Sequence, residues 1–478
     1  MPNLPLLDRA HTVAPPGYNR WLVPPAALAI HLSVGQAYAF SVFNNPLAQL
    51  LGSTAKHHVS GDWDKVQITH IFSLAIVFLG LSAAVFGRWL EGAGPRKAML
   101  ASALCFSSGF FVAALGIGLH LLPLVYLGYG VLGGIGLGLG YISPVSTLIK
   151  WFPDRPGMAT GLAIMGFGGG AMIGSPLAVN LMKHFAGPGD PGIVQTFFVM
   201  GALYFAFMMF GVFTVRVPAE GWKPAGYVST ARTVTMRGFT AGEAIKKPQF
   251  WLLWGVLFFN VTAGIGLLSV ASPMIQDLFP GRVTKEAAAG FVGLLSLFNL
   301  AGRFGWSSLS DKIGRKPAYL IYFILGSLLY ILVPIAANMG SIALFVGSAA
   351  LILSMYGGGF STIPAYLRDL FGTLEVGAIH GRLLTAWSAA GIAGPFLFAS
   401  LGEYALAHHL PPAQSYTQAL HVMAGLLALG LVCNLLVTPV KPDNDAPLSG
   451  SDAPAPQTAR ATSQDRVLER DNHGRDIR

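Results

Sequence analysis

The chain has 478 residues, of which 53% are hydrophobic and 11% are charged, and its mean hydropathy is +0.58. Soluble proteins carry about 25% charged residues, so this composition excludes an ordinary water-soluble globule. It predicts a chain that is surrounded largely by lipid. Cys105 and Cys433 both lie in apolar stretches without ligand spacing, which argues against a disulfide framework and against a metal site.

Twelve apolar stretches have about the length that a membrane crossing requires, which is about 20 residues. Their number predicts an all-α membrane protein with both termini on one side. A polar linker at 216–248 separates the sixth stretch from the seventh, and the segment after residue 440 cannot bury a core. We therefore expect an N-terminal segment at 1–20, six-helix bundles at 21–215 and 249–440, and a disordered tail at 441–478. The stretches lie near residues 21–43, 66–87, 98–119, 123–149, 157–182, 193–215, 249–275, 286–308, 317–337, 341–367, 378–402 and 417–439.

Basic residues gather in the loops on the side of both termini. By the positive-inside rule this side is cytoplasmic, so we expect a multi-pass protein of the cell inner (cytoplasmic) membrane, with both termini, the linker and the tail in the cytoplasm. Topology thus accounts for the net charge of +9, and we expect no nucleic-acid binding. The loops of the other side hold only Lys56, Lys65, Lys183, Arg282 and Lys285.

The chain repeats itself at an offset of 220 positions. Glu91 maps onto Asp311 and Gly94 maps onto Gly314, in similar loops after the second and eighth stretches. Several coincidences at one offset predict two homologous halves packed as parallel repeats, with a substrate site between them near the membrane midplane. Four further pairs share the offset: Pro144 and Pro364, Gly157 and Gly377, Gly161 and Gly381, and Gly174 and Gly394.

The doubled loop G-x-x-x-[D/E]-x-x-G-x-[R/K], with twelve spans and a long middle loop, resembles the major facilitator superfamily over about residues 18–440. Within it the chain resembles the oxalate/formate antiporter family and the monocarboxylate transporters. The supporting segments are GQAYAFSVF (35–43), NLAGRFGWSSLSDKIGRK (299–316) and LRDLFGTLEVGAIHGRLLTAWSAAGIAGP (367–395). The resemblance implies two pseudo-symmetric six-helix bundles and a secondary transporter that works by alternating access.

The repeated loop suggests a charge relay on the cytoplasmic side, whose pairs form in one rocking state and break in the other. The alternative is that these charges only anchor helix ends at the interface. Gly92 and Pro95 stand where the family favours basic residues, so we expect the first copy to be weaker. The relay candidates are Glu91, Arg96 and Lys97 in the first copy and Asp311, Arg315 and Lys316 in the second.

Arg303 is the one Lys or Arg that falls deep inside a predicted span, since Arg382 stands near the start of its span and is counted with the cytoplasmic side. A charge at that depth costs about 2.5–3.5 kcal/mol on insertion scales, so it normally faces a cavity or a partner. No Asp or Glu lies deep in any span, which leaves a carboxylate substrate as a counter-ion that fits the guanidinium fork. Packing against helix-end carbonyls is the alternative. The family resemblance implies that this Arg contacts the substrate carboxylate.

Asn299 lies one helical turn before Arg303 and could orient the guanidinium or bind the substrate. The monocarboxylate transporters resemble this chain but have a titratable Asp at that place, so proton coupling here would need another route. The oxalate transporter resembles it but supplies a second basic residue in the eleventh span, where this chain has Trp387. One fixed cation favours a monocarboxylate over oxalate, because a second negative charge would stay unpaired.

Amphipathic side chains near mid-span could wall a small binding site. Ordinary helix packing is the alternative for each of them singly. His31 and His380 are the candidates for proton coupling, because histidine titrates near neutral pH and because helices 1 and 11 line the cavity in the fold that the chain resembles. With Arg303 and Asn299, the expected substrate-binding residues are Gln36, Tyr38, Tyr141, Tyr356 and Trp387.

These residues predict a secondary active transporter that moves a small monocarboxylate of the formate, lactate or pyruvate type, coupled to protons or to a counter-anion. Oxalate:formate antiport is the main alternative, and protonated His31 or His380 would supply the missing charge. An anion sensor would require a folded output domain, and an enzyme would require a nucleophile with a base in the spans. We expect no cofactor and no metal, a monomer, and the substrate anion, protons or counter-anion and the lipid bilayer as partners.

Overall fold

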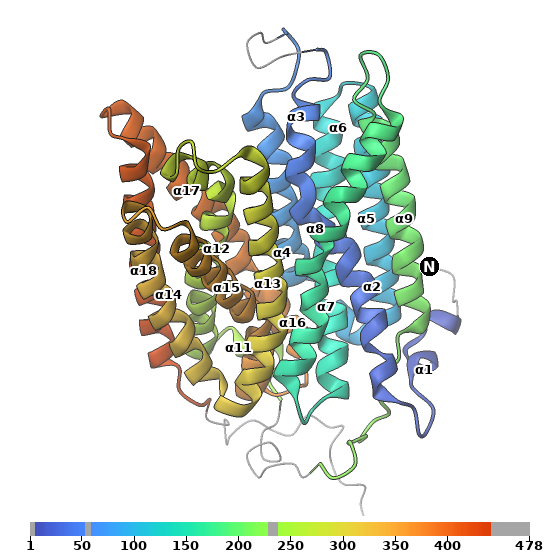
Figure 1. The fold of residues 1–478 in the computed structure, drawn as a ribbon. Coiled ribbons are helices and arrows are strands. Elements are labelled where there is room, and N and C mark those ends of the chain that lie inside the picture. The colour runs from blue at the N-terminus through green and yellow to red at the C-terminus, as the bar shows by residue number, and fades with distance from the viewer. Residues whose placement is uncertain (1–4, 53–58, 228–237, 441–478) are drawn as a thin grey trace, which may run out of the picture. The chain divides into compact units, whose positions relative to one another are not determined.

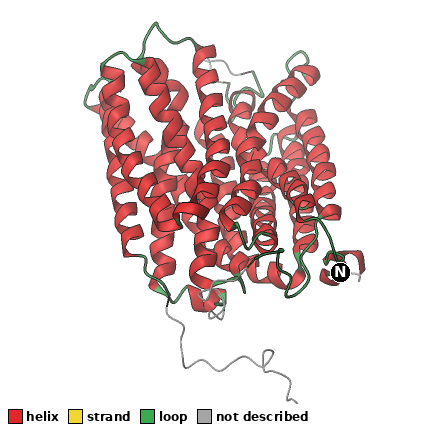
Figure 2. Cartoon of the chain, turned by 60° about the horizontal axis from the view of Figure 1, so that its bottom comes forward, coloured by secondary structure: helices red, strands yellow, loops and turns green. Residues whose placement is uncertain are grey.

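The computed structural model describes residues 5–52, 59–227 and 238–440, which fold into helices (Figures 1 and 2). The predicted all-α membrane fold and its count of twelve spans are confirmed within this part of the chain. The predicted tail at 441–478 lies outside the described residues, as does part of the linker, 228–237. The twelve membrane-length helices run over Arg20–Leu47, Val66–Ala93, Pro95–Gly118, Leu122–Trp151, Pro156–Phe185, Ile193–Thr214, Pro248–Leu278, Ala287–Ile313, Arg315–Asn338, Ile342–Phe371, Val376–Ala405 and Ala413–Leu436.

Several of these runs consist of more than one helical element. The first begins in a 3₁₀ turn and changes helix type again midway, the fourth contains a π-helical segment, and the eleventh is broken near one end. The elements in chain order are η1 (Pro5–Leu7), α1 (Arg9–Thr12), η2 (Arg20–Leu22), α2 (Pro24–Val34), η3 (Gly35–Phe43), α3 (Asn44–Leu47), α4 (Lys65–Ala93), α5 (Pro95–Gly118), α6 (Leu122–Val125), η4 (Tyr126–Gly133), α7 (Gly134–Trp151), α8 (Pro156–Phe185), α9 (Ile193–Thr214), α11 (Ala241–Ala244), α12 (Pro248–Leu278), α13 (Lys285–Ile313), α14 (Arg315–Asn338), α15 (Ile342–Phe371), α16 (Val376–Leu383), α17 (Thr385–Ala407) and α18 (Pro412–Leu436).

The internal repeat is visible in the helix bounds. Helix α13 begins and ends 220 positions after α4, and α14 begins and ends 220 positions after α5. A glycine with positive φ separates α4 from α5 and α13 from α14, with a φ of 85° at Gly94 and 92° at Gly314. Only glycine adopts such angles without strain, so the same backbone turn follows the second and the eighth spans.

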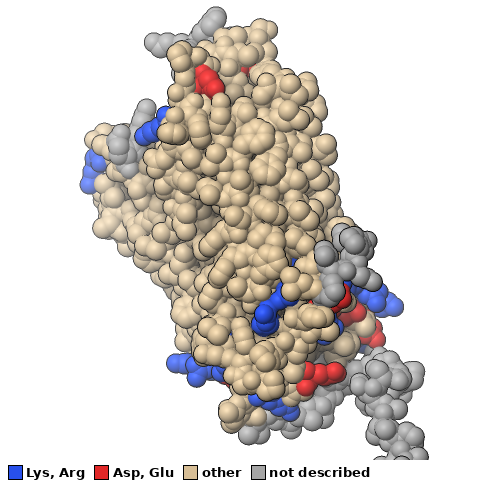
Figure 3. Space-filling model, turned by 90° about the vertical axis from the view of Figure 1, so that its right-hand side faces the viewer, with Lys and Arg blue, Asp and Glu red and all other residues tan. Residues whose placement is uncertain are grey.

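The two six-helix halves lie side by side in Figure 1, with α2 to α9 in one bundle and α12 to α18 in the other. The main contacts between them are those of α8 with α13 and of α4 with α16 and α17. The linker and the ends of α4 and α13 lie at the bottom of Figure 1, and we call this end the linker face. Figure 3 shows charged side chains at the two ends of the molecule and an uncharged band between them, as a membrane protein requires.

The first span changes helix type where it crosses α8. Helix α2 ends at Val34 and continues as the 3₁₀ helix η3. A Cβ atom added at Gly35 would stand 2.3 Å from the Phe167 carbonyl oxygen, and one added at Gly170 would stand 2.5 Å from the Gly35 carbonyl carbon. The two backbones therefore touch, which only glycine at both positions permits.

The eleventh span is not one continuous helix. Helix α16 ends at Leu383 and α17 begins at Thr385, so Leu384 separates the short segment near the linker face from the longer one. The sequence predicted a single span at 378–402, which is correct for the crossing but missed this break. The short helix α16 packs mainly against α4 of the other bundle, so it belongs to the contact between the halves.

Candidate functional site

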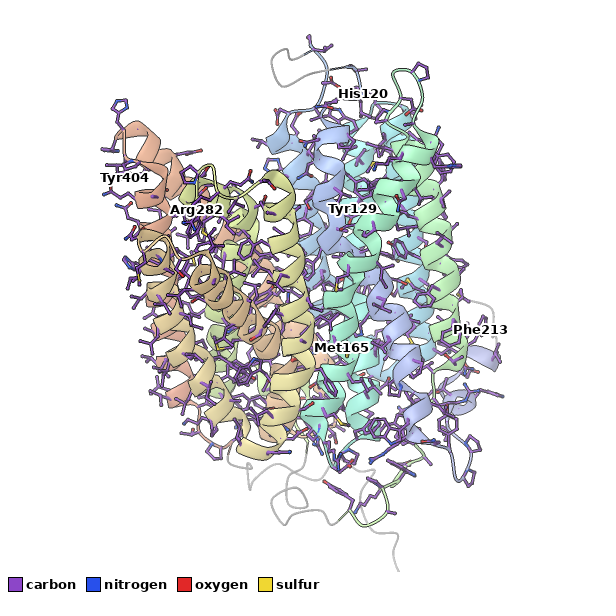
Figure 4. All side chains as sticks on the ribbon, viewed as in Figure 1. His120, Tyr129, Met165, Phe213, Arg282 and Tyr404 are labelled. Carbon is purple, nitrogen blue, oxygen red and sulfur yellow. The ribbon has the colours of Figure 1, made fainter. Side chains whose placement is uncertain are left out.

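Arg303 lies on α13 where that helix meets α8, and its side chain is fully buried. Glycines on α8 make room for it. A Cβ atom at Gly168 would stand 3.2 Å from Arg303 Nε, and one at Gly161 would stand 2.7 Å from the Arg303 carbonyl oxygen. Met165, which is labelled in Figure 4, lies where α8 runs beside α13. The residue before it, Ile164, contacts Arg303. The predicted lone guanidinium therefore lies between the two bundles and does not face lipid.

The guanidinium of Arg303 is only partly satisfied. Its Nε donates to Asn299 Oδ1 at 3.0 Å and its Nη1 donates to the Ile164 carbonyl oxygen at 3.4 Å. Its Nη2 has no hydrogen-bond partner. Within the described residues no carboxylate pairs with Arg303, so the positive charge is balanced by neutral dipoles alone. A buried cation with one unused donor edge is able to bind an anion.

Two phenylalanine rings lie beside this cation. The guanidinium carbon lies 5.3 Å from the ring centre of Phe360 on α15 and 5.8 Å from that of Phe167 on α8. Such cation–π contacts stabilise a desolvated guanidinium by about 2 kcal/mol each. Both rings thus contribute to the burial of the Arg303 charge.

Trp387 joins the predicted aromatic residues of both bundles into one cluster. Its ring centre lies 4.5 Å from that of Phe360, 5.3 Å from Phe167 and 5.4 Å from Tyr141. The ring of Tyr38 is 6.3 Å from Trp387. We call Tyr38, Tyr141, Phe167, Phe360 and Trp387 the aromatic cluster. Phe167 and Phe360 lie beside the Arg303 guanidinium, and Tyr38 and Tyr141 interact with it electrostatically.

Tyr38 and Tyr356 meet across the two bundles. Their hydroxyl oxygens are 3.3 Å apart, so one donates to the other. Both hydroxyls, and that of Tyr141, interact electrostatically with Arg303. The structure thus brings together Arg303, Asn299 and three of the predicted tyrosines.

The two predicted histidines come from different bundles, and both contact Tyr141. The ring centre of His31 on α2 is 5.4 Å from that of Tyr141, and the ring centre of His380 on α16 is 5.8 Å from it. His31 interacts electrostatically with both Arg303 and His380. Both imidazoles are buried, with 0% and 1% of their surfaces exposed.

Polar atoms without partners converge in this region. No hydrogen bond of normal geometry forms at Tyr141 Oη, at Trp387 Nε1, at Arg303 Nη2 or at the ring nitrogens of His31 and His380. A buried polar group without a partner costs about 1–3 kcal/mol, so native proteins rarely keep one without a function. Several of them beside one guanidinium indicate a binding site for a small polar anion.

Gln36 does not join this group. Its Oε1 accepts a hydrogen bond from Tyr129 Oη at 3.2 Å, and its side chain packs beside Gly174 of α8. Residues two positions apart do not share a helix face, so Gln36 points into the first bundle while Tyr38 points to Arg303. The structure thus places Tyr38 beside Arg303 and places Gln36, which was also predicted to bind substrate, beside Tyr129.

Phe167 and Phe360 are site residues that sequence reasoning missed, because it looked for side chains with a polar tip. A signal for Phe167 exists: it lies 220 positions before Trp387, and these repeat-related residues touch each other. Phe360 has no comparable signal, since its role depends on how α15 faces α13 in the folded protein.

Asp311 joins the bundles at the linker face. Its carboxylate accepts hydrogen bonds from the backbone N–H groups of Gly157 and Met158, both at 2.8 Å. These groups belong to the first turn of α8, whose unpaired N–H groups attract negative charge. Arg315 pairs with the same carboxylate at 2.6 Å, which agrees with the relay expected for the second copy.

Glu91 makes the equivalent contact in the first copy of the repeat. Its carboxylate accepts a hydrogen bond at 3.0 Å from the backbone N–H of Gly377, in the first turn of α16. Its ion-pair partner is Lys150 of α7, at 2.8 Å. We call the contacts of Asp311 and Glu91 the Asp311 cap and the Glu91 cap.

Three of the predicted relay residues do not pair with either cap carboxylate, which corrects the expected relay. Arg96 donates to the carbonyl oxygen of Val212 at 3.1 Å, near the end of α9. Lys97 pairs with Asp8 at 2.6 Å. Lys316 donates to the carbonyl oxygens of Leu435 and Val437, where α18 ends. Arg96 and Lys316 satisfy the unpaired carbonyls at helix C-termini, which is the anchoring alternative.

Other bonds between the bundles accompany the two caps. Arg368 donates to the Pro153 carbonyl oxygen at 3.1 Å, and Thr160 Oγ1 donates to the Ser361 carbonyl oxygen at 2.6 Å. Farther along α4, Ser388 donates to the Ile76 carbonyl oxygen at 2.8 Å. The bundles are therefore held together from the linker face to the level of Arg303 and the middle of α4.

Comparison with known proteins adds a family to this geometry. The family model described as Major Facilitator Superfamily matches residues 26–395 and 283–468. The oxalate:formate antiporter of Oxalobacter formigenes is 28% identical over 385 residues, which cover 80% of this chain and 85% of that protein. The apicoplast pyruvate carrier 1 of Toxoplasma gondii is 26% identical over 333 residues, which cover 58% of this chain and 60% of that protein.

A solved structure shows the same fold. The crystal structure of the transporter FucP in the outward conformation superposes with a TM-score of 0.62, at 14% identity, and covers 87% of this chain and 99% of that one. The two pseudo-symmetric six-helix bundles expected from the sequence are confirmed by this likeness.

Proposed function

We propose that this chain, which belongs to the Major Facilitator Superfamily of transporters, moves a small monocarboxylate of the formate, lactate or pyruvate type across a membrane. The observation that carries the proposal is the buried guanidinium of Arg303, which has a free Nη2 and no carboxylate partner within the described residues. A carboxylate that binds there removes an unbalanced charge and fills the unused donor edge. Asn299 holds the guanidinium in place, and the aromatic cluster excludes water.

Alternating access follows from the position of the two caps. We infer that Glu91 and Asp311 act as gates: with both caps formed, the linker face is closed and the substrate reaches Arg303 from the opposite face. Rocking of the bundles would break the two caps and expose Arg303 to the linker face. By the positive-inside rule we take the linker face as cytoplasmic and the membrane as the inner membrane of the cell, and we expect the protein to act as a monomer.

The proposed transport is coupled either to protons or to a counter-anion. His31 and His380 supply the titratable groups for proton coupling. Exchange of oxalate for formate is the second candidate function, supported by the likeness to the Oxalobacter formigenes antiporter. One fixed cation favours a singly charged substrate, whereas two carboxylates would leave one charge unpaired in the site.

The test is uptake of labelled formate, lactate, pyruvate and oxalate into proteoliposomes, each with and without a pH gradient and with and without internal anion. We expect Arg303→Ala to abolish uptake while the protein still folds and reaches the membrane. Arg282→Ala is the matched control, because Arg282 lies at the end opposite the linker face (Figure 4). Undiminished uptake by Arg303→Ala would refute the assignment of Arg303.

The charge argument has its own test in Trp387→Lys. This change adds a cation beside the aromatic cluster, so we expect the preference to shift from formate or lactate toward oxalate. The shift would be measured as the ratio of oxalate to formate inhibition constants. An unchanged ratio in a transport-competent Trp387→Lys protein would refute the claim that the number of fixed cations sets substrate charge.

A further inference from the structure

We infer that His31 and His380 together accept one proton when a doubly charged carboxylate binds, so that the site takes a dicarboxylate only with a proton and a monocarboxylate without one. This inference rests on the proposed function and extends it to a second substrate class. The proton comes from the water on the open side and travels with the dianion. The complex then carries the same net charge as Arg303 with a monocarboxylate.

The geometry that carries the inference is a pair of imidazoles at the edge of the site. His31 comes from one bundle and His380 from the other, and both rings contact Tyr141, with ring centres 5.4 Å and 5.8 Å from its own. Among the described residues, the ring nitrogens of His380 have no hydrogen-bond partner, and those of His31 have only weak contacts with the backbone of Ala27 and Tyr141. Groups that served only to pack the core would be expected to find a hydrogen-bond partner.

Electrostatics limits the pair to one proton. His31 interacts with both Arg303 and His380, so a charge on one imidazole opposes a charge on the other. A second positive charge next to Arg303 is unfavourable in the empty site and becomes favourable when a second carboxylate arrives. Proton uptake is therefore tied to the charge of the substrate.

The groups that face the imidazoles support this reading. Tyr141 on α7 contacts both rings and Arg303 on α13 interacts with His31, and Tyr38 on η3 and Tyr356 on α15 belong to the same region. Glu91 reaches α16 only through the Gly377 amide, at the linker face. The remaining titratable groups lie on α16, directly before it, or on the elements that pack against α2 or α16. They are Arg20, Lys65, His70, Arg88, Arg96, Lys97, Cys105, Lys150, Lys183, His184, Tyr204, Glu243, Asp277, Tyr366, Arg368, Asp369, Glu375, Arg382, Glu403 and Tyr404.

Arg382 is close in the chain but is not part of the pair. It lies two positions after His380, and residues two apart do not share a helix face. It makes no ring contact with the aromatic cluster. The fixed charge of the site thus remains that of Arg303 alone, and the imidazoles are the groups that can add a second positive charge.

Linkage fixes the sign of the expected pH dependence. A dianion complex holds one more proton than the empty site, so its stability rises as the pH falls. With one linked proton the apparent oxalate affinity changes by about tenfold per pH unit while the imidazoles titrate. Formate binding takes up no proton on the protein and stays flat over the same range.

The experiment uses the full chain in proteoliposomes loaded with formate, at equal pH on both sides, at about pH 6 and about pH 7.5, on either side of the ordinary histidine range. We measure inhibition of formate exchange by external oxalate and by external formate. We expect oxalate to inhibit more strongly at the lower pH, by about tenfold or more, while inhibition by formate is unchanged. His31→Gln and His380→Gln should each reduce this pH effect, and the double variant should remove it. His70→Gln is the control, because His70 is an exposed residue of α4.

A second readout keeps the inference distinct from a folding defect. Exchange of a dianion plus a proton for a monoanion moves no net charge, so an imposed membrane potential should not alter oxalate–formate exchange. In a double variant that still exchanges formate, any remaining oxalate exchange should respond to the potential. Equal pH effects in the wild type and the double variant would overturn the inference and leave formate transport intact. Loss of formate, lactate and pyruvate uptake in the wild type would instead remove the proposed function, and the inference with it.

Discussion

The Asp311 cap and the Glu91 cap occupy equivalent places in the repeat, yet they are built with different strength. Asp311 accepts two backbone hydrogen bonds from the first turn of α8, both at 2.8 Å, and pairs with Arg315 on its own helix end. Glu91 accepts one, at 3.0 Å, from the first turn of α16. In both cases a carboxylate of one bundle satisfies the N-terminus of a helix in the other.

The difference has a cause in the sequence. The position of Arg315 is held by Pro95 in the first copy, which has no charge to offer, and Glu91 therefore pairs with Lys150 of α7. The expectation that the first copy is weaker rested on this proline and on Gly92. The comparison teaches that the repeat preserves the contact between carboxylate and helix N-terminus, while the supporting cation changes place.

The basic residues one position after Pro95 and Arg315 make contacts within a bundle and not between the bundles. Arg96 and Lys316 are equivalent by the repeat, and each donates to carbonyl oxygens at the end of the last helix of its own bundle, α9 or α18. They therefore hold each bundle together and leave the contact between bundles to the caps. Variants of the caps should change the balance between the two access states, whereas variants of Arg96 or Lys316 should lower stability.

The largest effect is expected from Asp311→Asn. The amide keeps the shape but loses the charge that binds two helix N–H groups and Arg315, at a cost of about 2 kcal/mol to the closed linker face. This corresponds to roughly thirtyfold in the balance of access states. We would measure it as the alkylation rate of a cysteine introduced by Thr160→Cys, with Cys105 and Cys433 replaced, because Thr160 is fully buried between the bundles.

Asp8→Asn is a matched control for this measurement, because it removes a carboxylate that pairs with Lys97 within the first bundle only. Alkylation of Asp311→Asn at the wild-type rate would mean that the Asp311 cap does not hold the linker face closed.

Glu91→Gln should act in the same direction but less strongly. One backbone hydrogen bond and one partly exposed ion pair are lost, which together amount to about 1 kcal/mol or roughly fivefold in the same assay. The ranking of the caps is tested by the ratio of the change in alkylation rate in Asp311→Asn to that in Glu91→Gln. A larger effect of Glu91→Gln than of Asp311→Asn would contradict the ranking of the caps.

The spans, the repeat and the place of Arg303 could be predicted because each depends on local composition: apolar length, motif spacing and one charge among apolar residues. The break at Leu384 and the 3₁₀ helix η3 could not be predicted, since they arise where two backbones meet. The partners of Arg303 divide in the same way. Asn299 was found because it lies one turn away, whereas Phe360 is brought in by another helix.

A smaller effect is expected when an Arg, which supports Asp311 as Arg315 in the second copy, is introduced at the equivalent Pro95 of the first copy. Lys150→Ala removes the partner of Glu91 and should raise the alkylation rate about twofold, as expected for a partly exposed ion pair. Pro95→Arg in that background places an Arg four positions after Glu91, as Arg315 follows Asp311. The turn before it tolerates Arg, because Gly94 and Gly314 have nearly the same φ. We expect Pro95→Arg to return the rate toward the wild-type value.

Pro95→Arg alone is the control, and it should change the rate little because Lys150 already fills the role. If the rate of the Lys150→Ala protein did not respond to Pro95→Arg, the strength of the cap would not depend on a cation at this position.

The loops before the capped helices differ between the bundles as well. Before α8, Asp154 pairs with Arg20 at 2.6 Å. Before α16, Glu375 accepts a hydrogen bond from Ala241 of the linker and lies 3.5 Å from Arg88 of the other bundle. The ion pair of the first loop thus lies within its bundle, although Arg368 of the other bundle also donates to Pro153 of this loop, whereas the second loop is tied to the linker and to the opposite bundle.

The smallest effect is expected from the ion pair between Asp154 and Arg20, and it depends on pH. Partial burial opposes ionisation of Asp154, but the hydrogen bond and charge of Arg20 outweigh it and lower the pKa of Asp154 below its ordinary value. A lowered pKa means that the stabilisation is present above the ordinary pKa and disappears as the pH falls through the lowered one. For a pair that keeps some solvent contact we expect about 0.5 kcal/mol. The thermal midpoint of Asp154→Asn should therefore lie slightly below the wild-type value at about pH 6 and approach it toward about pH 3, and Arg20→Gln should behave alike. A difference that persists at the acid end would assign the effect to packing of the loop, since a protonated Asp154 can no longer form the ion pair.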